Sequence, residues 1–330
     1  MNDILPRLFR PALLVAAVLA CPVAWPQALS WSTGVVYEYD GSGNVRKMGS
    51  DAYVYDTANR IVRGSTAGVE QTYTYDAFGN RTGCMQAGGD CQSGMAIDSA
   101  TNRVAGLTYD ARGNLTRLPE GHELTYDEVG MVARETFATG SREYIYTADG
   151  ERLAVHSLSG GSGSWTWSVR GLDQKVQREF TSTDAGAIGT GDFRWSKDYI
   201  WRDGTLLATR QRESAAPDAP VVTYHYHVDH LGTPRMVTDS SGTVIGRHEY
   251  HAFGVERNGN ATEPAPSRMQ FTGHERDAYA DRTWPLDYMH ARYYDGRLGR
   301  FLSVDPAMDL KKAIPNPQMW NRYSYAWTIR

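Results

Sequence analysis

A run of histidines in the second half of the chain could bind a metal ion. The potential ligands are His225, His227, Asp229, His230, His248 and His251. The first three alternate, so a strand would present them on one face, and imidazole with carboxylate suits Zn²⁺ or a similar cation. The competing interpretation is structural, because His225 and His227 occupy positions where aromatic side chains fit a strand. We favour the structural interpretation and predict no metal and no cofactor.

Tryptophans could support another chemistry, the stacking of sugar rings. Trp165 and Trp167 are two residues apart, and Trp195 and Trp201 lie further along the chain. Tryptophans that share one face of a strand more often belong to a core. A carbohydrate-binding surface and a packed core therefore both stay open. The sequence contains no nucleophile triad, phosphate-binding glycine loop or dinucleotide fingerprint.

Two cysteines flank a short glycine-rich segment. Cys84 and Cys91 enclose Met-Gln-Ala-Gly-Gly-Asp, and in an oxidising compartment this spacing favours a local disulfide. The alternative is two free thiols, and zinc is disfavoured because no second ligand pair has matching spacing. A disulfide that closes so small a loop contributes at most ~3 kcal/mol.

The composition indicates a folded β protein. The chain has 330 residues, a formal charge of −4, 41% hydrophobic and 22% charged residues. These values allow a core and argue against general disorder. The negative net charge offers no overall positive potential, so nucleic acid is not a predicted partner. The 33 glycines and 20 tyrosines argue against a helical bundle and against a doubly wound nucleotide-binding enzyme.

Residues 1–28 are predicted to be a signal peptide. Arg7 and Arg10 precede an apolar run over residues 11–20, which is too short to span a bilayer comfortably. Small residues follow, and cleavage after Ala28 is expected. A weaker alternative makes Cys21 a lipidated residue that keeps the protein at a membrane. Either way we expect a secreted or cell-surface protein.

One phrase, Tyr-x-Tyr-Asp-x-x-Gly-Asn, recurs with variations along the first half of the chain. Its second tyrosine falls at Tyr39, Tyr55, Tyr75, Tyr109, Tyr126 and Tyr146. Most steps are 16–20 residues, and the longer gap holds a degenerate unit around residues 98–104. Tyr-x-Tyr places two rings on one face of a strand. Asp opens a turn by accepting backbone N–H groups, and Gly adopts the left-handed conformation that closes it. Each unit is therefore predicted to be a β-hairpin that needs its neighbours for stability.

These units resemble the YD repeats of bacterial Rhs proteins, Tc-toxin C subunits and animal teneurins. The second half contains blocks similar to the Rhs-associated core: residues 229–235, 271–277, 291–295, 299–306 and 321–326. The resemblance covers nearly all of the chain after residue 28. It implies an all-β fold of tandem antiparallel hairpins that wind as a spiral sheet into a shell, with the core motif sealing one end. Residues Tyr279 to Pro285 look inserted relative to that pattern.

Some members of the family carry a toxin after the core and cut it free inside the shell. The resemblance assigns that cleavage to two carboxyl groups and an arginine. In such a site one carboxyl group acts as the general base and the other as the general acid. Asp305 matches one acid and Arg292 the arginine. In the family the second acid lies in an Asp-Pro-x-Gly segment that would come after Arg330, so we expect only a half-site in this sequence. The alternative role of Asp305 is to cap the turn before Pro306.

The predicted organisation is a YD-repeat region over 29–213 and an Rhs-associated core over 221–330, truncated at its C-terminus and without an effector domain. A shell of this length would enclose roughly 4,000 Å³, whereas a folded toxin domain needs roughly 13,000 Å³. We therefore expect a non-enzymatic shell or interaction protein linked to toxin delivery or contact between bacteria. Its partner would be a toxin or effector, or a cell-surface glycan or protein. The alternatives are a carbohydrate- or protein-binding surface module and a remnant of a self-cleaving toxin carrier.

Overall fold

The protein is described by a computed structural model and is nearly all β. It describes residues 36–87, 89–92, 95–184, 193–213, 216, 218–257, 267–277, 285–306, 310–315 and 317–325. The expected signal peptide, Cys21 and most of the expected insertion between Tyr279 and Pro285 lie outside these residues. No helix within them is long and apolar enough to cross a membrane.

The first sheet has seven antiparallel strands that follow one another in chain order. They are β1 (Tyr37–Tyr39), β2 (Val45–Met48), β3 (Asp51–Tyr55), β4 (Ile61–Thr66), β5 (Val69–Tyr75), β6 (Arg81–Gln86) and β7 (Gly89–Gln92). This order is what successive hairpins produce.

The second sheet has 13 antiparallel strands, again in chain order. They are β8 (Thr108–Tyr109), β9 (Leu115–Arg117), β10 (Glu123–Tyr126), β11 (Val132–Phe137), β12 (Gly140–Tyr146), β13 (Arg152–Ser159), β14 (Ser162–Arg170), β15 (Val176–Thr183), β16 (Arg194–Arg202), β17 (Thr205–Arg212), β18 (Val221–Val228), β19 (Pro234–Thr238) and β20 (Val244–Arg247). The sheet runs from the repeat region into the expected core region through β18–β20. We call these two sheets the wall.

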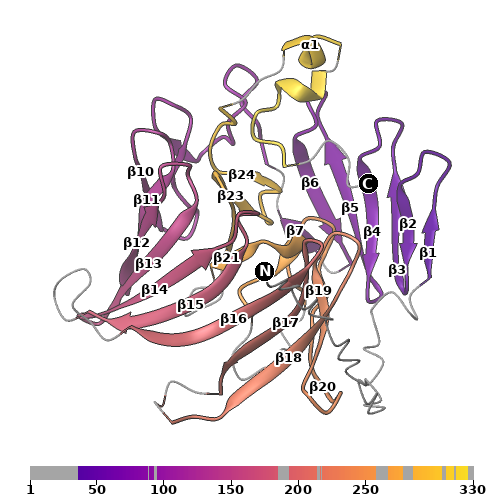
Figure 1. Ribbon diagram of the computed structural model, residues 1–330. Coiled ribbons are helices and arrows are strands. Elements are labelled where there is room, and N and C mark those ends of the chain that lie inside the picture. Colours follow the sequence, from indigo (N-terminus) through magenta and orange to yellow (C-terminus); the bar gives the residue numbers. More distant parts are fainter. Residues whose placement is uncertain are drawn as a thin grey trace, which may run out of the picture.

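A third sheet of four strands lies between the two larger ones (Figure 1). Its strands are β21 (Glu275–Asp277), β22 (Leu286–Met289), β23 (Arg292–Asp295) and β24 (Arg300–Phe301). The 3-10 helix η2 (Phe271–Gly273) precedes it, and α1 (Leu310–Ala313) and η3 (Pro317–Trp320) follow it. We call residues 267–277 and 285–306 the plug. None of the three sheets closes into a barrel, so the molecule is a partial shell.

The turns of the repeats form as their residue types predict. In the third unit, Asp76 accepts the backbone N–H groups of Phe78 and Asn80 at 2.9 Å each. Gly79 has φ +80°, a left-handed conformation that glycine adopts at little cost. The register between β5 and β6 shifts by one residue at Tyr75, which is the bulge expected when such a turn closes a hairpin. The degenerate unit also turns, with Asp98 accepting the N–H of Ala100.

The second tyrosine of a repeat ties its hairpin to the previous one. The hydroxyl of Tyr55 donates to the carbonyl of Val45 at 2.9 Å, and that of Tyr126 donates to Leu115 at 2.8 Å. Tyr75 and Tyr146 make the same contact with the hairpins before them. The repeated tyrosine therefore packs its ring and also joins consecutive units by a hydrogen bond.

The core lies where wall and plug meet. Leu286, Tyr288 and Tyr293 of the plug are buried against wall residues such as Leu124 and Val155. The wall therefore buries its inner rows of side chains partly against a sheet formed 130 or more residues later in the chain.

Candidate functional site

Arg292 and Asp305, the residues expected in a self-cleavage site, lie next to each other. Arg292 begins β23, and its Nη2 donates to Asp305 Oδ2 at 2.9 Å. The guanidinium also lies 3.7 Å from the centre of the Phe301 ring. Burial lowers the pKa of Arg292, and the neighbouring Asp305 acts against that shift.

The surroundings of Asp305 favour a structural role as well. Its backbone N–H donates to the carbonyl of Arg322, and Arg322 Nε donates to the carbonyl of Asp305 at 2.8 Å. One carboxylate beside an arginine cannot provide both the acid and the base of an aspartyl protease. The pair remains a predicted half-site that also holds the last segment of the chain against the plug.

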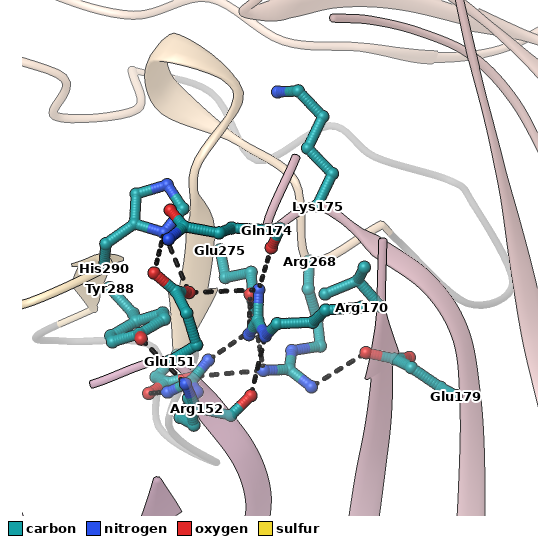
Figure 2. A network of polar contacts seen from close by, with 12 residues as sticks. Glu151, Arg152, Arg170, Gln174, Lys175, Glu179, Arg268, Glu275, Tyr288 and His290 are labelled. Carbon is teal, nitrogen blue, oxygen red and sulfur yellow. Dashed lines mark hydrogen bonds and ion pairs between the residues drawn. The ribbon is translucent and has the colours of Figure 1, made fainter. Parts of the chain in front are cut away.

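A larger cluster of buried charges joins the wall to the plug (Figure 2). Arg152 of β13 donates to Glu275 at 2.8 Å and to Asp277 at 2.5 Å, both on β21. Arg170, the last residue of β14, donates to the other oxygen of Glu275 at 2.5 Å. Arg268 of the plug binds Glu275 at 2.7 Å and reaches back to Glu179 of β15 at 2.9 Å. Glu275 therefore accepts from three arginines on three segments.

The charges in this cluster stabilise one another against burial. Burial alone would raise the pKa of Glu275, but Arg152, Arg268 and Arg170 together hold that pKa far below its usual range. Burial would likewise lower the pKa of Arg152, but Asp277 and Glu275 raise it. Arg152 is 1% exposed, and its guanidinium lies 4.3 Å from the centre of the Tyr288 ring. The lowered pKa of Glu275 and the raised pKa of Arg152 both favour the charged forms of this pair.

A second buried pair lies within the plug itself. Arg276 donates to both oxygens of Asp287, at 2.7 and 2.8 Å, and its Nη2 also reaches the carbonyl of Gly254. The side chains of the strand β21 thus alternate between partners: Glu275 and Asp277 bind Arg152 of the wall, while Arg276 binds the next plug strand.

Sequence reasoning missed this cluster. The block Phe271–Asp277 served only as a mark of resemblance, and no role was assigned to its charged residues. A signal was present, because Glu275, Arg276 and Asp277 are consecutive charges in a block otherwise suited to a strand. Arginine also supplies 29 of the 34 basic residues, and arginine is the cation that pairs best with carboxylates in buried positions.

The histidines considered as metal ligands have separate partners. His227 contacts Thr238 at 3.2 Å, and His248 contacts Glu256 at 2.8 Å. The ring of His230 meets Tyr37 edge-on with centroids 5.4 Å apart. Among the residues that the structure describes, no three His, Cys, Asp or Glu side chains come together as a metal site.

The tryptophans divide between two environments. Trp165 is stacked between His156, with centroids 4.2 Å apart, and Trp167, at 5.2 Å. His156 follows Val155 on β13, and the Val155 side chain packs on the plug. Because neighbouring side chains of a strand point to opposite faces, the stack of His156, Trp165 and Trp167 lies on the face of the sheet away from the plug. Trp201 instead packs against the core beside Tyr199.

Cys84 of β6 and Cys91 of β7 are joined by a disulfide with Cα atoms 5.4 Å apart. The two strands are already hydrogen-bonded neighbours. The bond therefore reinforces the last hairpin of the first sheet and lies far in sequence from the charged cluster.

The fold and the wall–plug contact define a class: a YD-hairpin β-shell with an internal plug. The family model described as "RHS protein" matches residues 223–258. The chain is 23% identical over 347 residues to double-stranded DNA deaminase toxin A of Burkholderia cenocepacia, covering 89% of this chain and 23% of that protein. It is 26% identical to toxin protein Tse5 of Pseudomonas aeruginosa (84% and 25% covered) and 23% identical to toxin subunit YenC1 of Yersinia entomophaga (82% and 34% covered).

The fold is also that of solved Tc-toxin structures. The crystal structure of TcdB2-TccC3 superposes with a TM-score of 0.67 at 20% identity, covering 89% of this chain and 17% of that one. The Photorhabdus luminescens Tc holotoxin pore gives a TM-score of 0.68 at 19% identity, covering 89% and 16%. The family model, the relatives and the shared fold together support an RHS/YD-repeat family for this chain. The chain spans about a third or less of the length of the relatives named above.

Proposed function

We propose that this chain is a structural shell segment of an RHS toxin-delivery system, in which its role is to build a wall and seal it rather than to catalyse a reaction. The observation that carries the proposal is the buried contact between wall and plug. Arg152, Arg170 and Glu275 hold a strand of the plug against the inner side of the wall. Such an arrangement suits the sealed end of a container.

The partner we propose is a toxin or effector. The relatives named above are toxins or toxin subunits, and each is longer than this chain. We therefore infer association with a toxin only for the shell region that these relatives share with this chain. A glycan partner has less support. The indole faces of Trp165 already stack on His156 and Trp167, which leaves those faces closed to a sugar ring.

We further propose that residues 1–28 direct export, with Cys21 lipidation as the weaker alternative. The Cys84–Cys91 disulfide supports this, because disulfides persist in oxidising compartments. N-terminal sequencing of the protein from its native host should begin at residue 29. A start at Cys21 would favour the lipoprotein, and an intact N-terminus would refute export by this signal.

Competition between bacteria tests the delivery role. A strain that lacks the gene should lose its advantage over a sensitive neighbour, and the wild-type gene should restore it. Arg152→Met, which breaks the wall–plug contact, should fail to restore it. Arg46→Met should restore it fully, because the Arg46 side chain is 62% exposed on β2. Equal competition by the deletion strain would refute the proposal.

The contact between Arg292 and Asp305 supports a second candidate, a remnant of a self-cleaving carrier. A family-like Asp-Pro-x-Gly segment fused after Ala326 should restore cleavage. Asp305→Asn and Arg292→Met should each abolish that cleavage. An uncut fusion with a correctly folded shell would refute these assigned roles.

A further inference from the structure

A small cavity opens where the plug meets the rim of the 13-stranded sheet. It lies at the turn between β14 and β15 and has a volume of about 70 Å³. Six of its lining side chains are charged or titratable: Arg170, Lys175, His274, Glu275, Tyr288 and His290. At ~30 Å³ per water molecule, the space fits two waters or one small polyatomic anion.

Lys175 supplies a positive charge that no carboxylate in the described part of the chain neutralises. Its Nζ lies 4.6 Å from the centre of the Trp201 ring. Figure 2 shows its side chain directed away from the ion-paired carboxylates, with no dashed contact on the ammonium group. Arg170 differs, because Glu275 and the carbonyl of Gln174 occupy its guanidinium.

Two imidazoles complete the cavity, and each uses only one of its nitrogens. His274 Nδ1 contacts the hydroxyl of Thr272 at 2.9 Å, and His290 Nδ1 contacts Glu151 at 3.0 Å. Their rings meet edge-on with centroids 5.8 Å apart. Within the described residues neither Nε2 has a hydrogen-bond partner, so both are available to a ligand. The His290 side chain is 44% exposed, which leaves the cavity an entrance.

We propose that this cavity is a binding site for a small dianionic oxyanion, of the phosphate or sulfate type, either free or as the end group of a larger molecule. Lys175 pairs with its charge, and the two imidazole Nε2 atoms donate to its oxygens when protonated. The proposal concerns ligand binding at the rim and does not depend on the shell role argued above.

The same groups dictate the direction of the pH dependence. The charged and titratable side chains facing the cavity are Arg170 and Lys175 from the wall, His274, Glu275, Tyr288 and His290 from the plug, and Glu151 beside His290. Burial, His290 and Lys175 lower the pKa of His274 to about 4. A bound dianion offsets that positive charge and favours protonated imidazoles. Binding therefore takes up protons and strengthens as the pH falls.

Titration calorimetry with sodium sulfate, at constant ionic strength set with chloride, tests the site in the whole chain. Sulfate is the probe because it stays a dianion between pH 8 and pH 6. We expect sulfate to bind more tightly at pH 6 than at pH 8, and Lys175→Met to weaken it by about tenfold or more. Lys175→Arg should retain binding. Lys47→Met is the matched control, since Lys47 is a 47% exposed lysine on β2.

His274→Gln separates the imidazole's part from that of the lysine. This variant should bind sulfate at pH 8 much as the wild type does and should lose part of the gain at pH 6. Binding that Lys175→Met leaves unchanged, or that weakens at pH 6, would overturn the proposal. Methyl phosphate and inorganic phosphate, compared at one pH, distinguish an end group from a free ion, and binding of either supports the site.

Discussion

At the scale of single residues, Glu275 is the centre of the wall–plug contact. Burying an ion pair costs desolvation that its Coulomb attraction only partly offsets, so such pairs are weak evidence for net stability. Removing one partner is different, because it leaves the others charged and uncompensated. Glu275 compensates Arg152, Arg170 and Arg268 at once.

We predict that Glu275→Gln lowers the free energy of unfolding by ~3–5 kcal/mol, the range for breaking a buried ion pair. The amide fills nearly the same volume but cannot neutralise three guanidinium groups. Urea denaturation followed by near-UV circular dichroism measures the change. Glu70→Gln is the control: the Glu70 side chain is 56% exposed beside Arg63, so we expect less than ~1 kcal/mol. Equal effects of the two substitutions would contradict the assignment.

Acid should destabilise the protein in two stages. The pKa of His274 is lowered to about 4 by burial and by His290 and Lys175. Since the unfolded chain binds that proton near pH 6.5, stability falls as the pH drops from 6.5 towards 4. The pKa values of Glu275 and Asp277 are also depressed, because their arginine partners outweigh burial. Their contribution is present above the unfolded values, near 4, and is lost below them.

Asp287 acts in the opposite direction, because burial raises its pKa despite Arg276. His274, Glu275 and Asp277 together outweigh Asp287. The free energy of unfolding should therefore fall as the pH drops below 6.5. Denaturation at pH 7, 5.5, 4 and 3 gives the profile. His274→Gln should reduce the first stage and leave the second. The first stage should not vanish, because burial also lowers the pKa values of His230 and His251. A wild-type profile that is flat from pH 7 to pH 4 would refute this account.

At the scale of elements, the repeated tyrosine couples consecutive hairpins. Tyr126→Phe should lower the free energy of unfolding by about 1 kcal/mol, since the carbonyl of Leu115 loses its donor. Tyr39→Phe is a matched control within the chain: it is the same position of the first repeat, is 58% exposed and donates to no carbonyl in the described residues. We expect that control to change stability by no more than a few tenths of a kcal/mol, and comparable losses in both variants would argue against the coupling.

The repeats were predictable from sequence because their determinants are local. Asp76 and Gly79 encode a turn through contacts within five residues, and the alternation of Tyr73 and Tyr75 defines a face. The partners of Arg152 were not predictable, because Glu275 and Asp277 lie more than 120 residues away. The pairing of Arg292 with Asp305 was expected only from the family resemblance. The cavity at Lys175 could not be expected, because folding brings four separate segments together to line it.

At the scale of the whole molecule, the plug occupies the space that a cargo would need. Tyr288 and Tyr293 of the plug are buried against the wall. A cavity between the first sheet and the plug region, lined by Tyr73 and Phe253, measures about 260 Å³. A folded domain of 100 residues needs roughly 13,000 Å³. Enclosure of a toxin therefore requires wall beyond the hairpins of this chain.

A reporter domain tests that conclusion. We predict that a folded 100-residue domain fused after Arg330 is released by protease as fast as the same domain fused, through the same linker, ahead of residue 29. If the plug fills the space that the wall surrounds, a domain fused at either end lies outside that space. Slower release of the C-terminal fusion alone would mean that the plug moves aside to admit cargo. Because Glu275 holds the plug through three arginines, Glu275→Gln should then remove the protection, and persistent protection in that variant would locate the cargo elsewhere.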